Sequence, residues 1–156
     1  MTETEFNEQT FLLIKPDAVQ RGVIGRIISR LEDKGLKIVA MKMLQVTPEQ
    51  AARQYECHFG KPFYSSLVDF ICSSPSIAMV VEGRDAIAIC RKIMGATSPS
   101  DSVPGTIRGD HALDVKHNLI HGSDSPESFV HEVKVYFAAE EILNYRLDLE
   151  RWVYYS

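Results

Sequence analysis

Apolar and polar residues follow one another in short segments that predict strands separated by helices. Continuous apolar runs rich in β-branched and large aliphatic residues predict strands over residues 10–16, 36–46 and 76–82. A further short apolar strand step lies at 119–120. Prolines or a glycine close the three long runs, as is typical of strand ends.

Helical spacing predicts the intervening segments. Ile24, Ile27, Ile28 and Leu31 recur on one helix face, and Gly35 is placed to end that helix. The order Thr47-Pro48-Glu49-Gln50 predicts a capping box at the start of a helix that runs to about Phe59. Further helices are predicted from Pro62 to the break at 73–75, and over 85–94, 125–137 and 138–144.

The pattern fails between residues 95 and 118, where Gly, Pro, Ser, Thr and Asp dominate. A loop of this length inside a compact domain is either disordered or functional. The chain ends in an aromatic cluster of Trp152, Tyr154 and Tyr155 within an extension over 145–156. We expect this tail to pack on its own subunit or on a neighbour.

The alternation of strands and helices predicts an α/β or α+β sandwich built on βαββαβ units. The length of 156 residues favours one domain over 1–156, with a polar N-terminal tail over 1–9. The first ten residues are acidic and polar, unlike a secretory signal, and no long apolar window predicts a membrane span. The three cysteines, Cys57, Cys72 and Cys90, form no paired motif, so reduced thiols in the cytoplasm are expected.

Seventeen basic and 21 acidic residues give a net charge of −4. This balance argues against a general nucleic-acid coat protein, which needs a strong basic excess. It leaves room for a small anionic substrate in a locally basic pocket.

The strongest candidate chemistry is a carboxylate on an apolar helix face. Glu132 lies within the stripe formed by Phe129, Val133 and Tyr136, and an inward carboxylate is costly unless it is paired. It could hold the imidazole of His121, which fixes the tautomer and makes the other ring nitrogen a better nucleophile. Two plainer interpretations stay open: Glu132 lies only at the edge of the stripe, or His121 is a turn residue without a role.

Several polar groups predict an anion site around His121. The N-terminus of the helix that follows offers backbone N–H groups, and Ser123 adds a hydroxyl. The other candidates are Lys15 at the end of a buried strand, Arg91, Thr97 and Arg108. No GxxxxGK[ST] motif occurs, so a nucleotide would bind without a P-loop. A metal site built on His111, His117 and His121 is conceivable but lacks a shared helix face, and His58 and His131 are interpreted as edge residues.

Residues 118–124, NLIHGSD, resemble the active-site signature of nucleoside diphosphate kinases. Segments 15–17 and 20–22, 61–63, and 104–110 match other motifs of that family in the family's order. The resemblance covers residues 10 to 155. It implies a ferredoxin-like sandwich with a four-stranded antiparallel sheet, and ping-pong transfer of a γ-phosphoryl group, mainly from ATP, to nucleoside diphosphates through a phosphohistidine. The products include CTP, GTP, UTP and the deoxynucleoside triphosphates.

The resemblance also assigns roles to residues. His121 would be the phosphorylated nucleophile and Glu132 its orienting carboxylate, with Tyr55 beside them. The nucleotide would be held by two groups of residues: Lys15, Arg91, Thr97, Arg108 and Asn118 at the phosphates and ribose, and Phe63, Leu67 and Val115 at the base. Ser123 and Asp124 would lie at the helix N-terminus near the phosphoryl group.

Mg²⁺ is expected to arrive on the substrate phosphates, with Asp124 at most a water-mediated neighbour and no ligand set from the protein alone. The expected partners are nucleoside tri- and diphosphates, with no membrane and no obligatory nucleic acid. The resemblance further implies a homo-oligomer, and Pro99 with the aromatic tail favours a hexamer over a tetramer. The sequence departs from the family at His117, His111 and Gly60, none of which is a catalytic position.

Two rival function classes remain on the residues alone. A nucleotide sensor of ferredoxin-like fold would form no covalent intermediate. A metal-dependent phosphohydrolase would use the histidines as ligands and release phosphate to water.

Overall fold

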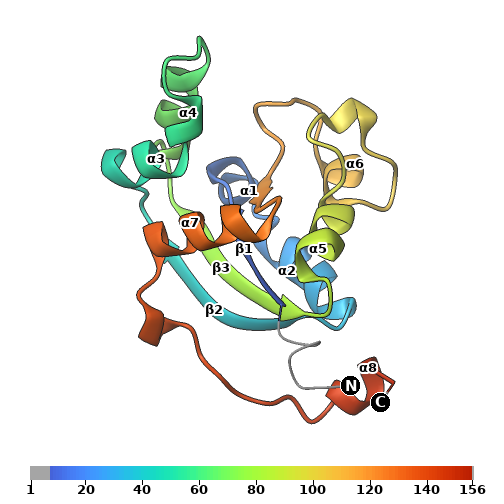
Figure 1. Ribbon diagram of the computed structural model, residues 1–156. Helices are drawn as coiled ribbons and strands as arrows, with labels where there is room; N and C mark the ends of the chain where they lie inside the picture. Colours follow the sequence, from blue (N-terminus) through green and yellow to red (C-terminus); the bar gives the residue numbers. More distant parts are fainter. Residues whose placement is uncertain (1–7, 156) are drawn as a thin grey trace.

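The computed structural model describes residues 8–155, which fold into one antiparallel sheet with helices on both faces (Figure 1). The strands are β1 (Glu8–Ile14), β2 (Lys37–Leu44), β3 (Ser76–Gly83) and β4 (Ile120–Gly122). Their order in the sheet is β2-β3-β1-β4, and every neighbouring pair is antiparallel. The predicted ferredoxin-like fold is confirmed, and its order places the short β4 at an edge beside β1.

Helices and 3₁₀ turns fill the segments between and after the strands. The α-helices are α1 (Pro16–Gln20), α2 (Ile24–Asp33), α3 (Pro48–Gln54), α4 (Tyr64–Ile71), α5 (Ala86–Met94), α6 (Ile107–His111), α7 (Pro126–Tyr136) and α8 (Glu150–Val153). The 3₁₀ turns are η2 (Glu56–His58), η3 (Pro99–Asp101) and η4 (Ala139–Glu141). The predicted capping box of α3 is present, because Thr47 Oγ1 accepts from Gln50 N–H and the Gln50 side chain accepts from Thr47 N–H.

The alternation of side chains along β1 divides the core into two layers. Leu12 and Ile14 pack with residues of α2 and α5, whereas Phe11 and Leu13 face the layer that contains residues of α3 and α7. All four side chains are fully buried. A strand covered on both faces reads as a continuous apolar run rather than an alternating one, which explains why β1 was predicted correctly.

Several segments differ from the sequence prediction. The loop over 95–118 contains η3 and α6, the helix predicted over 138–144 is only the turn η4, and α1 and α8 were not predicted. Residues 1–7 of the predicted polar tail lie outside the described residues, and Glu8 and Gln9 belong to β1. Short helices carry too few residues for a detectable apolar period, so local hydrogen bonds set them instead.

Side chains of α2 hold the long loop in place. Arg30 donates to the carboxylate of Asp110 at 2.6 Å and to the carbonyl of Gly105 at 2.8 Å. Gly105 N–H in turn donates to Asp110 at 2.8 Å. The loop is therefore ordered by polar contacts, although its sequence has no apolar pattern.

The C-terminal segment lies partly against the edge of β2. Leu143 N–H donates to the carbonyl of Val39 at 2.9 Å, and the hydroxyl of Tyr145 donates to that of Ile38. Tyr154 packs inward through its hydroxyl, which accepts from Arg84 N–H at 3.1 Å, but Trp152 is 80% exposed.

Within residues 8–155, no helix is both long and apolar enough to cross a membrane.

Gly109 allows α6 to lie against the preceding turn, since a Cβ at this position would lie 2.0 Å from the carbonyl oxygen of Val103. We predict that Gly109→Ala lowers the free energy of unfolding by about 1–3 kcal/mol, because backbone must move to relieve the clash. Gly25→Ala on α2 is the matched control: a Cβ there meets nothing within 4 Å. The control should be neutral or stabilising by up to about 1 kcal/mol. Urea unfolding at one protein concentration measures both, and equal effects would contradict the prediction.

Candidate active site

The pairing of β4 with β1 orients the side chain of His121 toward α7, the helix that carries Glu132. His121 lies on β4 directly opposite Leu13 of β1, and directly paired residues project to the same face of a sheet. That face is covered by α7, so His121 points toward this helix (Figure 1). Its side chain stays 27% exposed, which leaves room for a reacting group.

Glu132 is buried on α7, and its carboxylate accepts hydrogen bonds from two side chains. Its Oε1 lies 2.7 Å from His121 Nε2, and its Oε2 accepts a short hydrogen bond from the hydroxyl of Ser123. An ionised carboxylate only accepts, so Nε2 carries the proton and Nδ1 keeps its lone pair. The prediction that Glu132 faces inward and pairs with His121 is confirmed.

Tyr55 belongs to the core layer that also contains residues of α7. It lies at the end of α3 and is buried. Burial, followed by the charge of Glu132, raises the pKa of its phenol well above the ordinary value. Tyr55 therefore stays neutral and acts as a wall or a hydrogen-bond donor, not as a base.

Three cations, Lys15, Arg91 and Arg108, lie near one another and near the strand that carries His121. Burial, together with the charge of Arg108, lowers the pKa of Lys15 to about 8, although Asp17 raises it in part. Burial and the neighbouring Arg91 lower the pKa of Arg108 to about 10. Arg91 donates from Nη1 to the carbonyl of Gly122 at 3.2 Å. Because buried like charges repel, this cluster is suited to an anion that neutralises it.

Arg108 is fixed by the backbone before any ligand binds. Its Nε donates to Asn118 O at 3.2 Å, its Nη1 to Gly95 O at 3.1 Å and its Nη2 to Ile120 O at 2.5 Å. A guanidinium has five N–H donors, so two remain for a phosphate. The sequence predicted only the phosphate role of Arg108 and missed its role in fixing the backbone.

Asn118 carries an acceptor that no residue within 8–155 satisfies. Its Nδ2 donates to the carbonyl of Thr97 at 2.9 Å, whereas its Oδ1 is buried without a partner among the described residues. A buried acceptor without a donor is costly, and a ligand hydroxyl would satisfy it. Thr97 enters the site through its carbonyl, and its side chain is exposed.

The candidate base-binding residues lie on two separate segments. Phe63 precedes α4 and is 46% exposed, Val115 follows α6 and is 54% exposed, and Leu67 is half-buried on α4. Phe63 also contacts the ring of His58 edge-on, with 5.3 Å between the centroids. His58, interpreted from sequence as a surface or edge residue, therefore contacts one of the candidate base-binding residues. Burial and the charges of Lys61 and His121 lower the pKa of its imidazole.

The N-terminus of α7 contributes less than the sequence predicted. Its first residue is Pro126, which has no N–H, and the N–H of Ser128 is taken by the side chain of Ser125. Ser123 serves Glu132, and Asp124 accepts from the Ser128 hydroxyl at 2.6 Å. Most donors of this helix end are thus occupied, and the cations are the main source of positive charge.

The residues present do not form a metal site of their own. Over the described part of the chain, no group of three or more His, Cys, Asp or Glu side chains could hold a metal ion. His111 Nε2 lies instead 3.4 Å from Arg30 Nη2, and the ring of His117 is tilted by 54° to that of Phe70, with 5.1 Å between the centroids.

Comparison with known proteins matches the whole fold to one family. The family model described as nucleoside diphosphate kinase matches residues 8–142. A nucleoside diphosphate kinase of Staphylococcus epidermidis is 56% identical over 147 residues, which cover 94% of this chain and 99% of the relative. One from Archaeoglobus fulgidus is 53% identical, with 94% of this chain and 97% of the relative covered.

Solved structures give the same match. The nucleoside diphosphate kinase of Halobacterium salinarum in complex with CDP superimposes with a TM-score of 0.92 at 47% identity, covering 95% of this chain and 99% of that one. The apo enzyme of Encephalitozoon cuniculi superimposes with a TM-score of 0.91 at 38% identity, covering 94% of this chain and 99% of that one.

The three carbonyls held by Arg108 predict a test of its structural role. Arg108→Lys keeps the charge but offers a single ammonium, which cannot reach three separated carbonyls. We expect the variant to lose about 2–4 kcal/mol of unfolding free energy, since hydrogen bonds from charged groups contribute about 1.5–3 kcal/mol each. Arg53→Lys, at an exposed position, is the control. Urea unfolding measures both variants, and a loss no larger than that of the control would contradict this role.

Proposed function

The chain belongs to the nucleoside diphosphate kinase family, and we propose that His121 is the residue through which it passes a phosphoryl group from one nucleotide to another. Its activity is transfer of the γ-phosphoryl group of a nucleoside triphosphate to a nucleoside diphosphate, in two half-reactions. The observation that carries the proposal is the 2.7 Å contact of Glu132 with His121 Nε2, which leaves Nδ1 free.

In the first half-reaction, the Nδ1 lone pair attacks the γ-phosphorus. The bond from that phosphorus to the β–γ bridging oxygen breaks, and the nucleoside diphosphate leaves with the electron pair. In the second half-reaction, a β-phosphate oxygen of another diphosphate attacks the phosphohistidine, and the P–N bond breaks. Glu132 holds the Nε2 proton throughout and stabilises the positive charge that the ring gains on phosphorylation.

The remaining residues position the nucleotide. Lys15, Arg91 and the two free donors of Arg108 neutralise the phosphates, with Thr97 beside them. Asn118 Oδ1 accepts from a ribose hydroxyl, which supplies its missing donor. The base lies between Phe63 with Leu67 and Val115, and stacking reads few base edges, so the enzyme accepts several bases. CDP in the halobacterial relative supports a nucleoside diphosphate in this pocket.

The family uses a divalent cation, which we assign as Mg²⁺ that enters on the substrate phosphates. This assignment is supported by the absence of a group of acidic ligands within residues 8–155. Asp124 is engaged by Ser128 and acts at most through water.

We also assign a homo-oligomer, favouring a hexamer over a tetramer, and a cytoplasmic location. Strand β2 is an edge strand that leaves Met41 at 54% and Met43 at 58% exposure, and Trp152 projects from the tail. Exposed apolar side chains on an open edge favour pairing with a second copy.

A labelling experiment tests the nucleophile. After incubation with γ-labelled ATP and Mg²⁺, the wild-type protein should carry acid-labile, alkali-stable label. His121→Ala should carry none, and Glu132→Gln should label about 100-fold more slowly because it loses the orienting charge. Glu127→Gln, an exposed change on α7, is the matched control and should behave as wild type. Equal labelling of His121→Ala would exclude the proposed nucleophile.

The low pKa of Lys15 predicts the alkaline limit of activity. Lys15 is charged below its pKa of about 8 and neutral above it, so kcat/KM should fall as pH rises through about 8. Bound phosphates raise the pKa of this ammonium, so the corresponding fall in kcat should lie at higher pH. Lys15→Arg keeps its charge and should move the limit of kcat/KM upward. An unmoved limit in this variant would assign the titration to another group.

A further inference from the structure

The backbone just before His121 is strained. Leu119 has a φ of +76°, which a side chain other than glycine rarely adopts. The N–H of Ile120 donates to the carbonyl of Asn118 at 2.9 Å, and this bond skips one residue and defines a γ-turn centred on Leu119. Such a turn persists only where its surroundings hold it. The turn stands between Asn118 and His121, so its geometry sets the spacing of two site residues.

The three carbonyls of this turn and the N–H of Leu119 all have partners from elsewhere in the fold. Arg108 holds the carbonyls of Asn118 and Ile120, and Lys15 N–H donates to the carbonyl of Leu119 at 2.9 Å. The remaining group is the N–H of Leu119, which donates to Oδ2 of Asp17 at 3.0 Å. Asp17 is therefore the side chain that accepts from the N–H of Leu119, the central residue of the strained turn.

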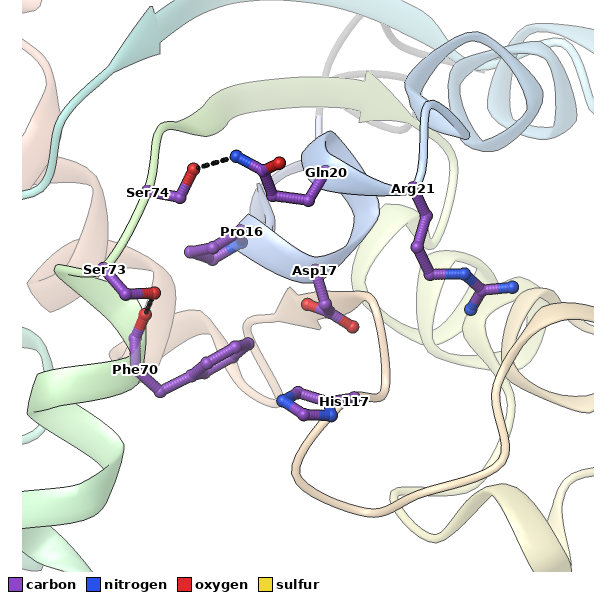
Figure 2. A pocket seen from close by; sticks show the side chains of 8 residues that line it. All are labelled: Pro16, Asp17, Gln20, Arg21, Phe70, Ser73, Ser74 and His117. Atoms are coloured by element: carbon purple, nitrogen blue, oxygen red, sulfur yellow. Dashed lines mark hydrogen bonds between the residues drawn. The ribbon is translucent and has the colours of Figure 1, made fainter.

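The same carboxylate also acts through its charge on Lys15, one of the three cations of the site. Asp17 lies in the first turn of α1, two residues after Lys15, and points toward the loop that carries His117 (Figure 2). It borders a cavity of about 420 Å³, which Phe70 and His117 also line. Lys15 Nζ lies over the Phe70 ring, 5.7 Å from its centre. Asp17 thus touches the turn through one oxygen and acts on Lys15 through its charge.

The second oxygen of Asp17 argues against a role in stability alone. Oδ1 is buried and has no partner among residues 8–155. A buried carboxylate oxygen without a donor is costly. Retaining the group is understandable if its charge and its hydrogen bond act on the neighbouring site.

We propose that Asp17 is a positioning residue, which holds the γ-turn at Leu119 in register with His121 and whose negative charge acts on the neighbouring Lys15. The proposal rests on the function assigned above. Without Asp17, the turn can relax toward a common conformation, which displaces Asn118 and His121 relative to Arg108. Displacements of about 1 Å in an active site can cost about 100-fold in rate.

The charge has a separate consequence for Lys15. Two charged groups act on it, Asp17 from α1 and Arg108 from α6, in opposite directions, and Asp17 raises its pKa. Removing the negative charge while keeping a hydrogen-bond acceptor should therefore lower the pH at which Lys15 loses its proton. The two functions of one carboxylate can be separated by two substitutions.

The test compares Asp17→Ala, which removes acceptor and charge, with Asp17→Asn, which keeps an acceptor and removes only the charge. The rate of labelling by γ-labelled ATP is measured against nucleotide concentration and against pH. Asp17→Ala should lower the maximum labelling rate about 10- to 100-fold, with the half-saturating ATP concentration changed less than about threefold. Asp17→Asn should retain most of the rate near neutral pH, with its alkaline limit moved to lower pH. Asp33→Asn, an exposed acidic residue at the end of α2, is the control.

The outcomes separate this proposal from the proposed function. Labelling of His121→Ala would overturn the nucleophile whatever Asp17 does. If wild type labels and His121→Ala does not, then an unshifted alkaline limit in Asp17→Asn would overturn the present inference. So would a normal labelling rate in Asp17→Ala. If Asp17→Ala does not fold, the pH profile of Asp17→Asn decides alone, since a purely structural role would leave that limit in place.

Discussion

A buried carboxylate determines the arrangement of this site. Glu132 lies on the covered face of α7, where an unpaired charge is costly, and it is satisfied by His121 from β4 and by Ser123 just beyond that strand. Both donors are available only because β4 pairs with β1 in a register that turns His121 toward α7. The order of the sheet, the face of the helix and the tautomer of the imidazole therefore depend on one another. A shift of the register by one residue would send His121 to the opposite face and leave Glu132 without its ring partner.

Lys15, Arg91 and Arg108 give the site an excess of positive charge. Lys15, Arg91 and Arg108 repel one another in a region where burial has already weakened their hydration, and the lowered pKa values of Lys15 and Arg108 express that cost. A polyphosphate removes the repulsion, so part of the free energy of nucleotide binding comes from relief of strain that the fold imposes. The long loop supplies Arg108 for this purpose and is itself held by Arg30 through Asp110 and Gly105. Loop order and anion binding thus depend on the same set of polar contacts.

Much of this could be predicted from sequence, and the failures have physical reasons. The strands and long helices follow apolar patterns that tertiary packing then reinforces, and Glu132 was recognisable because it interrupts such a pattern. The helices α1, α6 and α8 were missed because each is stabilised by local hydrogen bonds within four or five residues. The sequence could not show that Asp17 contacts Leu119, which lies 102 positions further along the chain. Nor could it show that His58 contacts the ring of Phe63 or that the charge of the distant His121 acts on it. The N-terminus of α7 offers an anion few free donors, because Pro126 has no N–H and Ser125 accepts from that of Ser128, although both residues are visible in the sequence.

Arg108 connects the strained backbone with the chemistry. Three of its five donors hold carbonyls, including the two on either side of Leu119, so the guanidinium cannot move toward a ligand without disturbing the turn next to His121. Its two remaining donors therefore point where the backbone places them, and little reorganisation is needed when charge develops on a phosphoryl group. Preorganised donors of this kind stabilise a transition state more than mobile ones of equal charge. The unfavourable φ of Leu119 is tolerated because contacts from Arg108, Lys15 and Asp17 hold the turn, and the contacts from Arg108 also fix its guanidinium beside the strand that carries His121.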